Sequence, residues 1–161
     1  MWGIWAALLV AASLCDLRHR RLPNGLLLSA SLVALGFQGA RLYGSPLSLA
    51  MASAPLTSGI WATVPPPAVC LASALVFLAA AAALELACRR RGVSLMGLGD
   101  IKLLACLAAG AGPLVGIGGG LLGCGLGGIV ALLGRNTHFA AGPWICGGCA
   151  LLWWWVSRVG L

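Results

Sequence analysis

The chain has 161 residues, of which 61% are hydrophobic and only 8% are charged, and its mean hydropathy is +1.02. A soluble domain carries about 25% charged residues, so this composition argues against a water-soluble globular fold and against intrinsic disorder. The formal net charge is +7, but the basic residues lie between apolar runs and form no single basic face, which argues against nucleic-acid binding. The composition therefore predicts one integral membrane domain over residues 1–161.

Six apolar segments follow one another along the chain. We expect each to be a transmembrane helix, because backbone groups in lipid must be hydrogen-bonded within their own segment. The segments cover residues 2–15, 25–40, 68–88, 101–112, 114–133 and 139–157. Several are shorter than the roughly 20 residues that usually span a bilayer, so these are expected to tilt little or to borrow flanking residues. Residues 42–67, rich in proline, serine and threonine, are expected to form an outer loop or an interfacial segment.

The distribution of basic residues predicts the orientation of the chain. If the N-terminus lies outside, eight lysines and arginines face the cytoplasm and only Arg41 and Arg158 face outward, in agreement with the positive-inside rule. Six of the seven tryptophans then fall at the outer interface, where an aromatic belt is common, and Trp144 is the exception. We therefore expect an all-α polytopic membrane protein with about six transmembrane helices and both termini on the outer side.

Small residues mark the fifth and sixth segments. Glycines at positions 116, 119, 120, 123 and 127 are expected to let helices approach closely in lipid, and a pliable wall beside a substrate helix is the alternative. Cys146 and Cys149 have the spacing of a zinc or redox pair, but neither further ligands nor a soluble βαβ setting is evident. We expect both to pack within the span, and no metal site is predicted.

Only three residues of the chain are acidic, and an ionisable group at a membrane boundary is costly to keep. Glu85 lies four residues before Arg89, which predicts a structural ion pair on one helix. Asp16 ends the first span, and Asp100 opens the fourth. The predicted topology brings both aspartates to the cytoplasmic face, although 84 positions separate them in the chain.

Each aspartate has a structural and a functional interpretation. Asp16 could be a solvated acid paired with Arg18 or Arg20, and Asp100 could be the N-cap of its helix. Alternatively, two carboxylates that share one proton can hydrolyse a peptide: the ionised one takes a proton from water, and the neutral one protonates the carbonyl oxygen. For that chemistry the pattern favours Asp16 as proton donor and Asp100 as base, because a carboxylate is disfavoured at a helix C-terminus and favoured at an N-terminus.

Two motifs resemble those of the type IV prepilin leader peptidases. Residues 16–24 (Asp-Leu-Arg-His-Arg-Arg-Leu-Pro-Asn) resemble the first active-site motif of that family. Residues 97–102 (Gly-Leu-Gly-Asp-Ile-Lys) resemble its Gly-x-Gly-Asp signature with the basic residue that follows. The motifs occur in the expected order and at a matching distance, and the resemblance covers the whole chain. Gly142-Pro143 is similar to a weaker third feature, to which no site role is assigned.

The resemblance implies an aspartic endopeptidase of the bacterial inner membrane that removes the basic leader from prepilins or pseudopilins, after a glycine, at the cytoplasmic face. It assigns the catalytic dyad to Asp16 and Asp100. Five other residues match supporting positions of the two motifs: Gly97, Gly99, Lys102, Pro23 and Asn24. A helix start and its cap is an alternative role for Pro23 and Asn24, and snorkelling is one for Lys102.

The resemblance implies no cofactor. Methyl transfer is not expected, because the insertion with two Cys-x-x-Cys pairs that longer members carry does not occur here. Two other functions remain open at this point: a small membrane transporter that carries protons or cations on its aspartates, and a non-enzymatic assembly subunit of a pilus or secretion machine. Transport sites usually lie near the bilayer midplane, which both aspartates avoid. The expected partners are the lipid bilayer and the apolar helix of a prepilin or pseudopilin.

Overall fold

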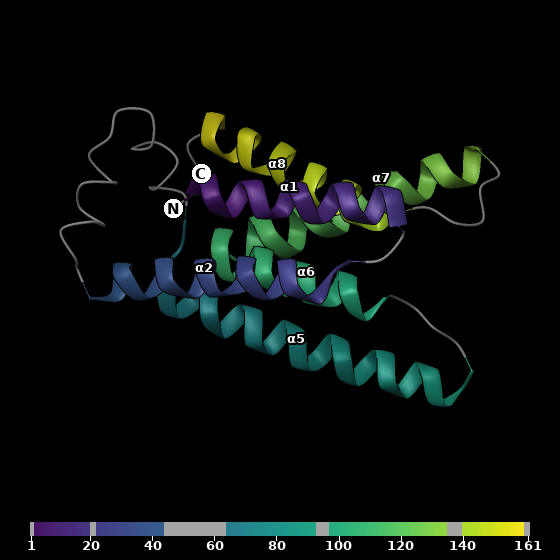
Figure 1. Cartoon of the computed structure of the whole chain (residues 1–161), viewed down its shortest axis with the longest axis horizontal. Helices are drawn as coiled ribbons and strands as arrows, with labels where there is room; N and C mark the ends of the chain where they lie inside the picture. The colour runs from purple at the N-terminus through teal and green to yellow at the C-terminus, as the bar shows by residue number, and fades with distance from the viewer. Residues whose placement is uncertain (1, 20–21, 44–63, 93–96, 135–139, 160–161) are drawn as a thin grey trace.

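The structure, a computed structural model, describes residues 2–19, 22–43, 64–92, 97–134 and 140–159 (Figure 1). Within these ranges the chain is helical and forms no β-strand, so the predicted all-α class is confirmed for the part that the structure describes. The elements are α1 (Trp2–His19), α2 (Asn24–Leu42), α5 (Pro67–Arg90), α6 (Leu98–Ala111), the π-helical turn η1 (Leu114–Gly118), α7 (Gly119–Leu133) and α8 (Ala141–Val159).

Among the described residues, three helices are long and apolar enough to cross a membrane. These are α2, α5 and the continuous helix Leu114–Leu133 that η1 and α7 form together. α6 has 14 residues, which corresponds to a length of about 21 Å and falls short of the roughly 30 Å hydrocarbon core. Six spans therefore remain a prediction as far as α1, α6 and α8 are concerned. Most of the predicted outer segment 42–67 lies outside the described residues.

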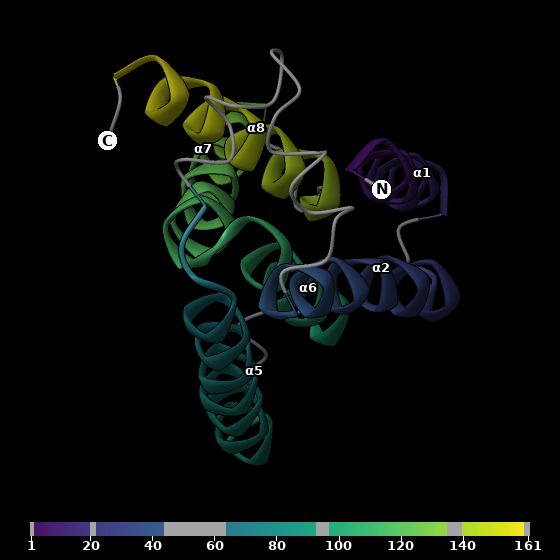
Figure 2. The same ribbon diagram turned by 90° about the vertical axis from the view of Figure 1, so that its left-hand side faces the viewer.

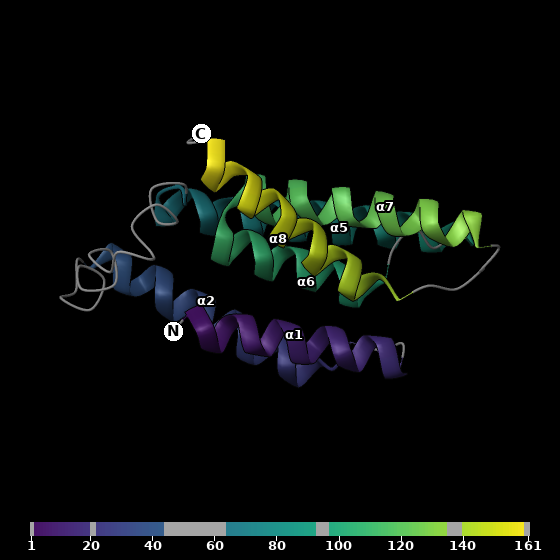
Figure 3. The ribbon, with the colours of Figure 1, turned by 90° about the horizontal axis from the view of Figure 1, so that it is seen from above.

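The helices lie side by side, and α6 occupies the centre of the bundle. α6 packs against α2, α5, η1 and α8, and residues 103–111 of α6 are all buried. α1 packs against α2 and α8, and α7 packs against α8. Seen along the bundle (Figure 2) and from above (Figure 3), α1 and α2 form one edge and α5 and α7 the opposite edge.

Glycines bring the helices around α6 close together. A Cβ atom added at Gly116 would clash with the backbone of Ala108, and one added at Gly119 would lie 2.7 Å from the Cα atom of Cys149. The Cys149 thiol donates a hydrogen bond of 3.4 Å to the Gly116 carbonyl. The close helix packing predicted for these glycines is therefore present, and Cys149 packs among the helices as predicted.

Gln38 of α2 holds the C-terminal end of α6 in place. Its Nε2 atom donates hydrogen bonds to the carbonyl oxygens of Ala109, at 2.7 Å, and of Gly110, at 3.2 Å. Arg41 in turn donates to the Gln38 Oε1 atom at 3.1 Å. The last carbonyl groups of a helix lack partners within the helix, so the fully buried Gln38 side chain satisfies two of them and fixes α6 against α2.

Large apolar side chains cover the outside of the bundle. Leu75 and Val76 of α5 are each 68% exposed, and Leu132 of α7 is 80% exposed. Extensive apolar exposure is unfavourable in water and marks a membrane or partner surface. Together with the three span-capable helices, it identifies the chain as a membrane protein.

The helix ends alternate along the chain, so that one end of the bundle collects the C-terminal ends of α1, α5 and α7 and the N-terminal ends of α2, α6 and α8 (Figure 1). We call this the aspartate end, because it holds Asp16 in the last turns of α1 and Asp100 in the first turn of α6. The described lysine and arginine residues near the helix ends that meet here are Arg18, Arg89, Arg90, Arg91 and Lys102, whereas Arg41 and Arg158 lie in the last turns of α2 and α8, at the opposite end.

Candidate active site

Asp16 is buried near the end of α1, with only 6% of its surface exposed. Its Oδ2 atom accepts a hydrogen bond of 2.9 Å from the backbone N–H of Gly142, which lies in the first turn of α8. The first N–H groups of a helix have no partner within the helix, and they form the positive end of its dipole. The start of α8 therefore stabilises a negative charge on the Asp16 carboxylate.

The absence of a side chain at Gly142 leaves room for this contact. A Cβ atom at that position would lie 2.9 Å from Oδ2 and 3.3 Å from Cβ of Asp16, so a larger residue would displace the carboxylate. The alternative pairing of Asp16 with Arg18 is wrong, since no such ion pair occurs among the described residues. Arg20, the other predicted partner, lies outside the described residues.

Asp100 is the third residue of α6 and not its N-cap, so the capping interpretation is wrong. The N-cap is Gly97, and no side-chain cap hydrogen bond is formed. Gly97 has φ −65° and ψ 138°, an extended conformation that any residue adopts, so its backbone angles do not require glycine. A Cβ atom at Gly97 would, however, lie 2.9 Å from the Asp100 Oδ2 atom, and the glycine thereby keeps space for the carboxyl group.

The two carboxyl groups interact electrostatically. Asp100 lies just before the apolar segment that begins at Ile101, and its pKa is raised from 3.8 to about 6. Burial is the main cause and the negative charge of Asp16 is the second, while a hydrogen bond with the Gly97 backbone acts in the opposite direction. Two neighbouring carboxylates that repel each other favour a state in which they hold a single proton.

Asp100 is the better candidate for the protonated partner and Asp16 for the ionised one, which is the opposite of the assignment made from the sequence. The sequence-based argument rested on the dipole of the helix that carries each aspartate. It did not include the N-terminus of α8, which donates a hydrogen bond to Asp16, or the burial that raises the pKa of Asp100.

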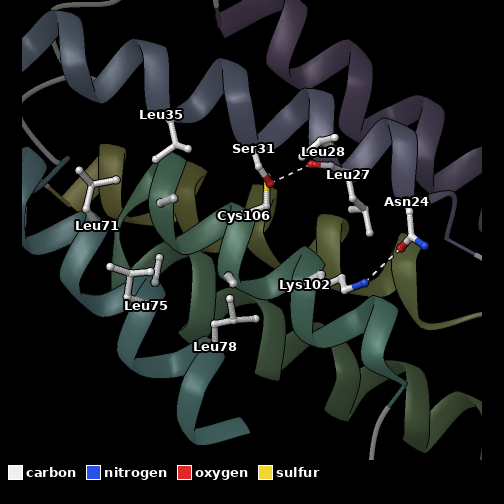
Figure 4. Close-up of a pocket in the computed structure, with 13 residues that line it drawn as sticks. Asn24, Leu27, Leu28, Ser31, Leu35, Leu71, Leu75, Leu78, Lys102 and Cys106 are labelled. Carbon is white, nitrogen blue, oxygen red and sulfur yellow. Dashed lines mark hydrogen bonds between the residues drawn. The ribbon is translucent and has the colours of Figure 1, made fainter. Parts of the chain in front are cut away.

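Asn24 and Lys102, two of the predicted supporting residues, contact each other at the start of α2 and α6. The Lys102 Nζ atom donates a hydrogen bond of 3.2 Å to Asn24 Oδ1 (Figure 4). Pro23 occupies the N-cap position of α2, where no side-chain cap hydrogen bond is formed. The capping role expected of Asn24 is therefore wrong, and its side chain instead ties the start of α2 to that of α6.

Gly99 allows the first turn of α6 to lie against the connection between α1 and α2. A Cβ atom at Gly99 would lie 3.2 Å from Cβ and 3.3 Å from Cδ1 of Leu22. This is the close approach by another segment that the sequence predicts for the motif glycines. Sequence reasoning did not identify Leu22 or Gly142 as parts of the site; for Gly142, the resemblance of Gly142-Pro143 to a third family feature was the available signal.

An apolar cavity of about 530 Å³ opens between α2, α5 and α6, and the Asn24–Lys102 pair lies at one end of it (Figure 4). Its other lining residues are Leu27, Leu28, Ser31, Leu35, Leu71, Ala74, Leu75, Leu78, Ala105, Cys106 and Ala109. From Asn24 to Leu35 the cavity follows α2 for about 16 Å, at 1.5 Å per residue. It can therefore take one face of an apolar helix.

The third acidic residue, Glu85, is not part of this arrangement. It is buried, and Arg89 Nε donates to its Oε1 atom at 2.7 Å, so the predicted ion pair is confirmed. Within the described residues, no three histidine, cysteine or acidic side chains come together as a metal site would require.

The chain matches the model of the type IV leader peptidase family over residues 3–132, which is most of its length and includes both aspartates. The chain belongs to the type IV leader peptidase family. Membership of this family identifies the chain as a protease. Together with the apolar helices, it identifies the chain as a membrane protease. No curated protein and no solved structure matches the chain. The match to the leader peptidase family ends before α8, so Gly142 lies outside it.

Proposed function

We propose that this leader peptidase is an aspartic endopeptidase that removes the basic leader from prepilins or pseudopilins, with Asp16 and Asp100 as its catalytic dyad. The observation that carries the proposal is the convergence of these two aspartates at one end of the bundle, where the charge of Asp16 raises the pKa of Asp100. A carboxyl group whose pKa is raised beside a second carboxyl group on another helix is typical of acid–base catalysis. The ion pair of Glu85 with Arg89 keeps the remaining carboxylate out of the reaction.

The dyad hydrolyses the peptide bond with one water molecule. The ionised Asp16 takes a proton from the water as its oxygen attacks the carbonyl carbon, and Asp100 gives its proton to the carbonyl oxygen. The resulting gem-diol collapses as the C–N bond breaks: the leaving nitrogen takes the proton from Asp16, and a hydroxyl proton returns to Asp100. The products are a leader with a free carboxyl group and a substrate with a new amino terminus, and the dyad is restored.

We place the aspartate end at the cytoplasmic face of a bacterial inner membrane, with six spans and both termini outside. The arginines and Lys102 at this end agree with the positive-inside rule. The exposed Trp154 and Trp155 side chains, near the end of α8, fall at the opposite interface. Cleavage would then occur where the apolar helix of a substrate meets the cytoplasm.

The partner proposed for the cavity between α2, α5 and α6 is the apolar helix of the substrate. Leucine and alanine side chains form most of its walls, as recognition of an apolar helix requires. Its polar end is formed by Asn24 and Lys102, two residues after Asp100. Neither Asp16 nor Asp100 lines the cavity, so we propose that a helix bound there extends past this polar end to reach the dyad.

The proposal is tested by co-expression with a model prepilin and by measurement of leader removal by mass. The wild type is expected to cleave after a glycine, and Asp16→Asn and Asp100→Asn are expected to abolish cleavage at unchanged protein level. Glu85→Gln, which neutralises the third carboxyl group of the chain, is the matched control and should retain activity. Wild-type processing by either aspartate variant would refute the dyad, and processing by both would favour a non-enzymatic assembly role.

A further inference from the structure

We propose that the N-terminus of α8 is a positioning element of the active site: the backbone N–H of Gly142 holds Asp16 in its ionised form, as the base that activates water. Because Gly142 has no side chain, the Asp16 carboxylate can lie directly against the backbone at this position. This inference rests on the proposed function. It concerns a helix that lies outside the range matched by the family.

Two independent features of the geometry carry the inference. The hydrogen bond from Gly142 to Asp16 Oδ2 is 2.9 Å long and buried, so water does not compete for it. A methyl group at Gly142 would lie 2.9 Å from the same oxygen atom, closer than an ordinary contact. The N–H donor of Gly142 and the space left by its missing side chain therefore both adjoin the Oδ2 atom of Asp16. Both belong to α8, which packs directly against α1.

The helix dipoles explain why Asp16 needs this contact. Asp16 lies near the C-terminal end of α1, where a negative charge is disfavoured. The N-terminus of α8, a helix of 19 residues, opposes that effect with a donor that is charge-assisted. An aspartate at this place is thereby kept available as a base.

Few other ionisable groups act on Asp16 within the described residues. From α6 the carboxyl group of Asp100 faces it, and from α8 the thiol of Cys146 lies within electrostatic reach. Arg18 and His19 follow Asp16 on its own helix and are exposed. The first two turns of α2 contain no ionisable residue. Among the described residues, the contact that donates a hydrogen bond directly to this carboxylate is the Gly142 N–H.

Pro143 affects the design of the test. A residue that precedes proline avoids the helical conformation because its Cβ and N–H clash with the proline ring, and Gly142 has no Cβ. We therefore compare variants in a Pro143→Ala background, which removes this restriction. Gly142→Ala then adds only the methyl group, and Gly142→Pro also removes the N–H, at a position in the first turn where proline is tolerated.

Both Gly142 variants are expected to reduce kcat for a model prepilin at least about tenfold relative to Pro143→Ala, with KM little changed. The acidic limb of the pH–rate profile is expected to move to higher pH by about one unit in Gly142→Pro, because its charged base has lost a donor. Gly147→Ala is the matched control: it lies on the same helix, and a Cβ there contacts nothing within 4 Å. Unchanged kcat and an unmoved acidic limb in Gly142→Pro would overturn the inference.

A second measurement does not depend on activity or on the stability of the Gly142 variants. In the wild-type chain labelled with ¹⁵N-glycine, the Gly142 amide proton should resonate downfield and titrate with the Asp16 carboxyl group. Asp16→Asn should remove both effects, and their persistence in that variant would overturn the inference. The same variant separates the two proposals. If Asp16→Asn still removes the leader, the proposed function fails. If Asp16→Asn is inactive but the Gly142 variants cleave normally, only the positioning role is refuted.

Discussion

Leader removal by the wild-type chain is expected to fall as the pH rises above about 6. In the proposed mechanism the dyad works with one shared proton, which Asp100 holds, and the pKa of Asp100 is raised from 3.8 to about 6. One pH unit above this value about a tenth of the molecules retain the proton, and two units above it about a hundredth do. The ratio kcat/KM for a model prepilin should therefore fall about tenfold per pH unit on the alkaline side.

The same pKa shift affects stability, and the two effects must be separated. The pKa of Asp100 is higher in the folded than in the unfolded chain, so the folded protein binds the proton more tightly. The resulting stabilisation is fully present below pH 3.8 and is lost as the pH rises through about 6. Asp100→Asn should abolish this part of the pH dependence of unfolding.

Initial rates of leader release, measured by mass from about pH 5 to about pH 8 in lipid nanodiscs, test the reasoning. The folded fraction is measured at each pH, so that loss of protein is not counted as loss of catalysis. Because the two carboxyl groups are coupled, the limbs of the profile report the pair and not one residue. A rate that stays flat or rises through pH 6 would refute the shared proton, since the doubly ionised dyad would then be the active form.

Three other contacts in the structure give further expected outcomes. Leu75→Trp, in the cavity wall, should raise KM for a prepilin several-fold, whereas Val76→Trp, at an equally exposed neighbour outside the cavity, should not. Gly99→Val should lower kcat, because its side chain would crowd the Cδ1 atom of Leu22, which lies 3.3 Å from the Cβ position at Gly99, and Leu22→Ala, which removes Cδ1, should restore part of the rate. Glu85→Ala should lower the free energy of unfolding by about 1–3 kcal/mol without changing kcat of the folded protein, because its ion pair lies outside the dyad.

Each of these outcomes has a contradicting result in the same assays. Equal KM values for the two tryptophan variants would show that the substrate helix does not use the cavity. A failure of Leu22→Ala to restore any activity to Gly99→Val would show that crowding between α6 and the α1–α2 connection is not the cause. Loss of kcat in folded Glu85→Ala, measured by thermal unfolding and leader release on one preparation, would give Glu85 a part in the reaction.

Much of the candidate site was predictable because the signals for it are local. Hydropathy identifies the apolar helices, and the alternation of helix direction then brings the end of α1 and the start of α6 to the same end of the bundle. Since only three acidic residues occur, the two aspartates stand out without further information. The Glu85–Arg89 pair is local as well, because residues four apart on a helix are neighbours.

The details of the site depend on contacts between helices that no local pattern contains. Asn24 binds Lys102 from 78 positions away, and Gly142 donates to Asp16 from 126 positions away. Reasoning from each helix alone offered a cap as an alternative role for Asn24 and favoured Asp16 as the proton donor. The contacts with the partner helices instead place Asn24 against Lys102 and favour the proposed role of Asp16 as the base.

The amino-acid sequence by itself determined that this is a helical membrane protein of the leader peptidase family with two aspartates at one end. Composition, helix length and motif spacing suffice for that, because they act within single segments of the chain. Only the tertiary structure showed that Gly142 of α8 donates a hydrogen bond to Asp16 and that burial raises the pKa of Asp100. The charge state of each aspartate depends on the dipole of α8 and on the burial of Asp100. Both effects come from packing between helices that are far apart in the sequence, so no local pattern contains them.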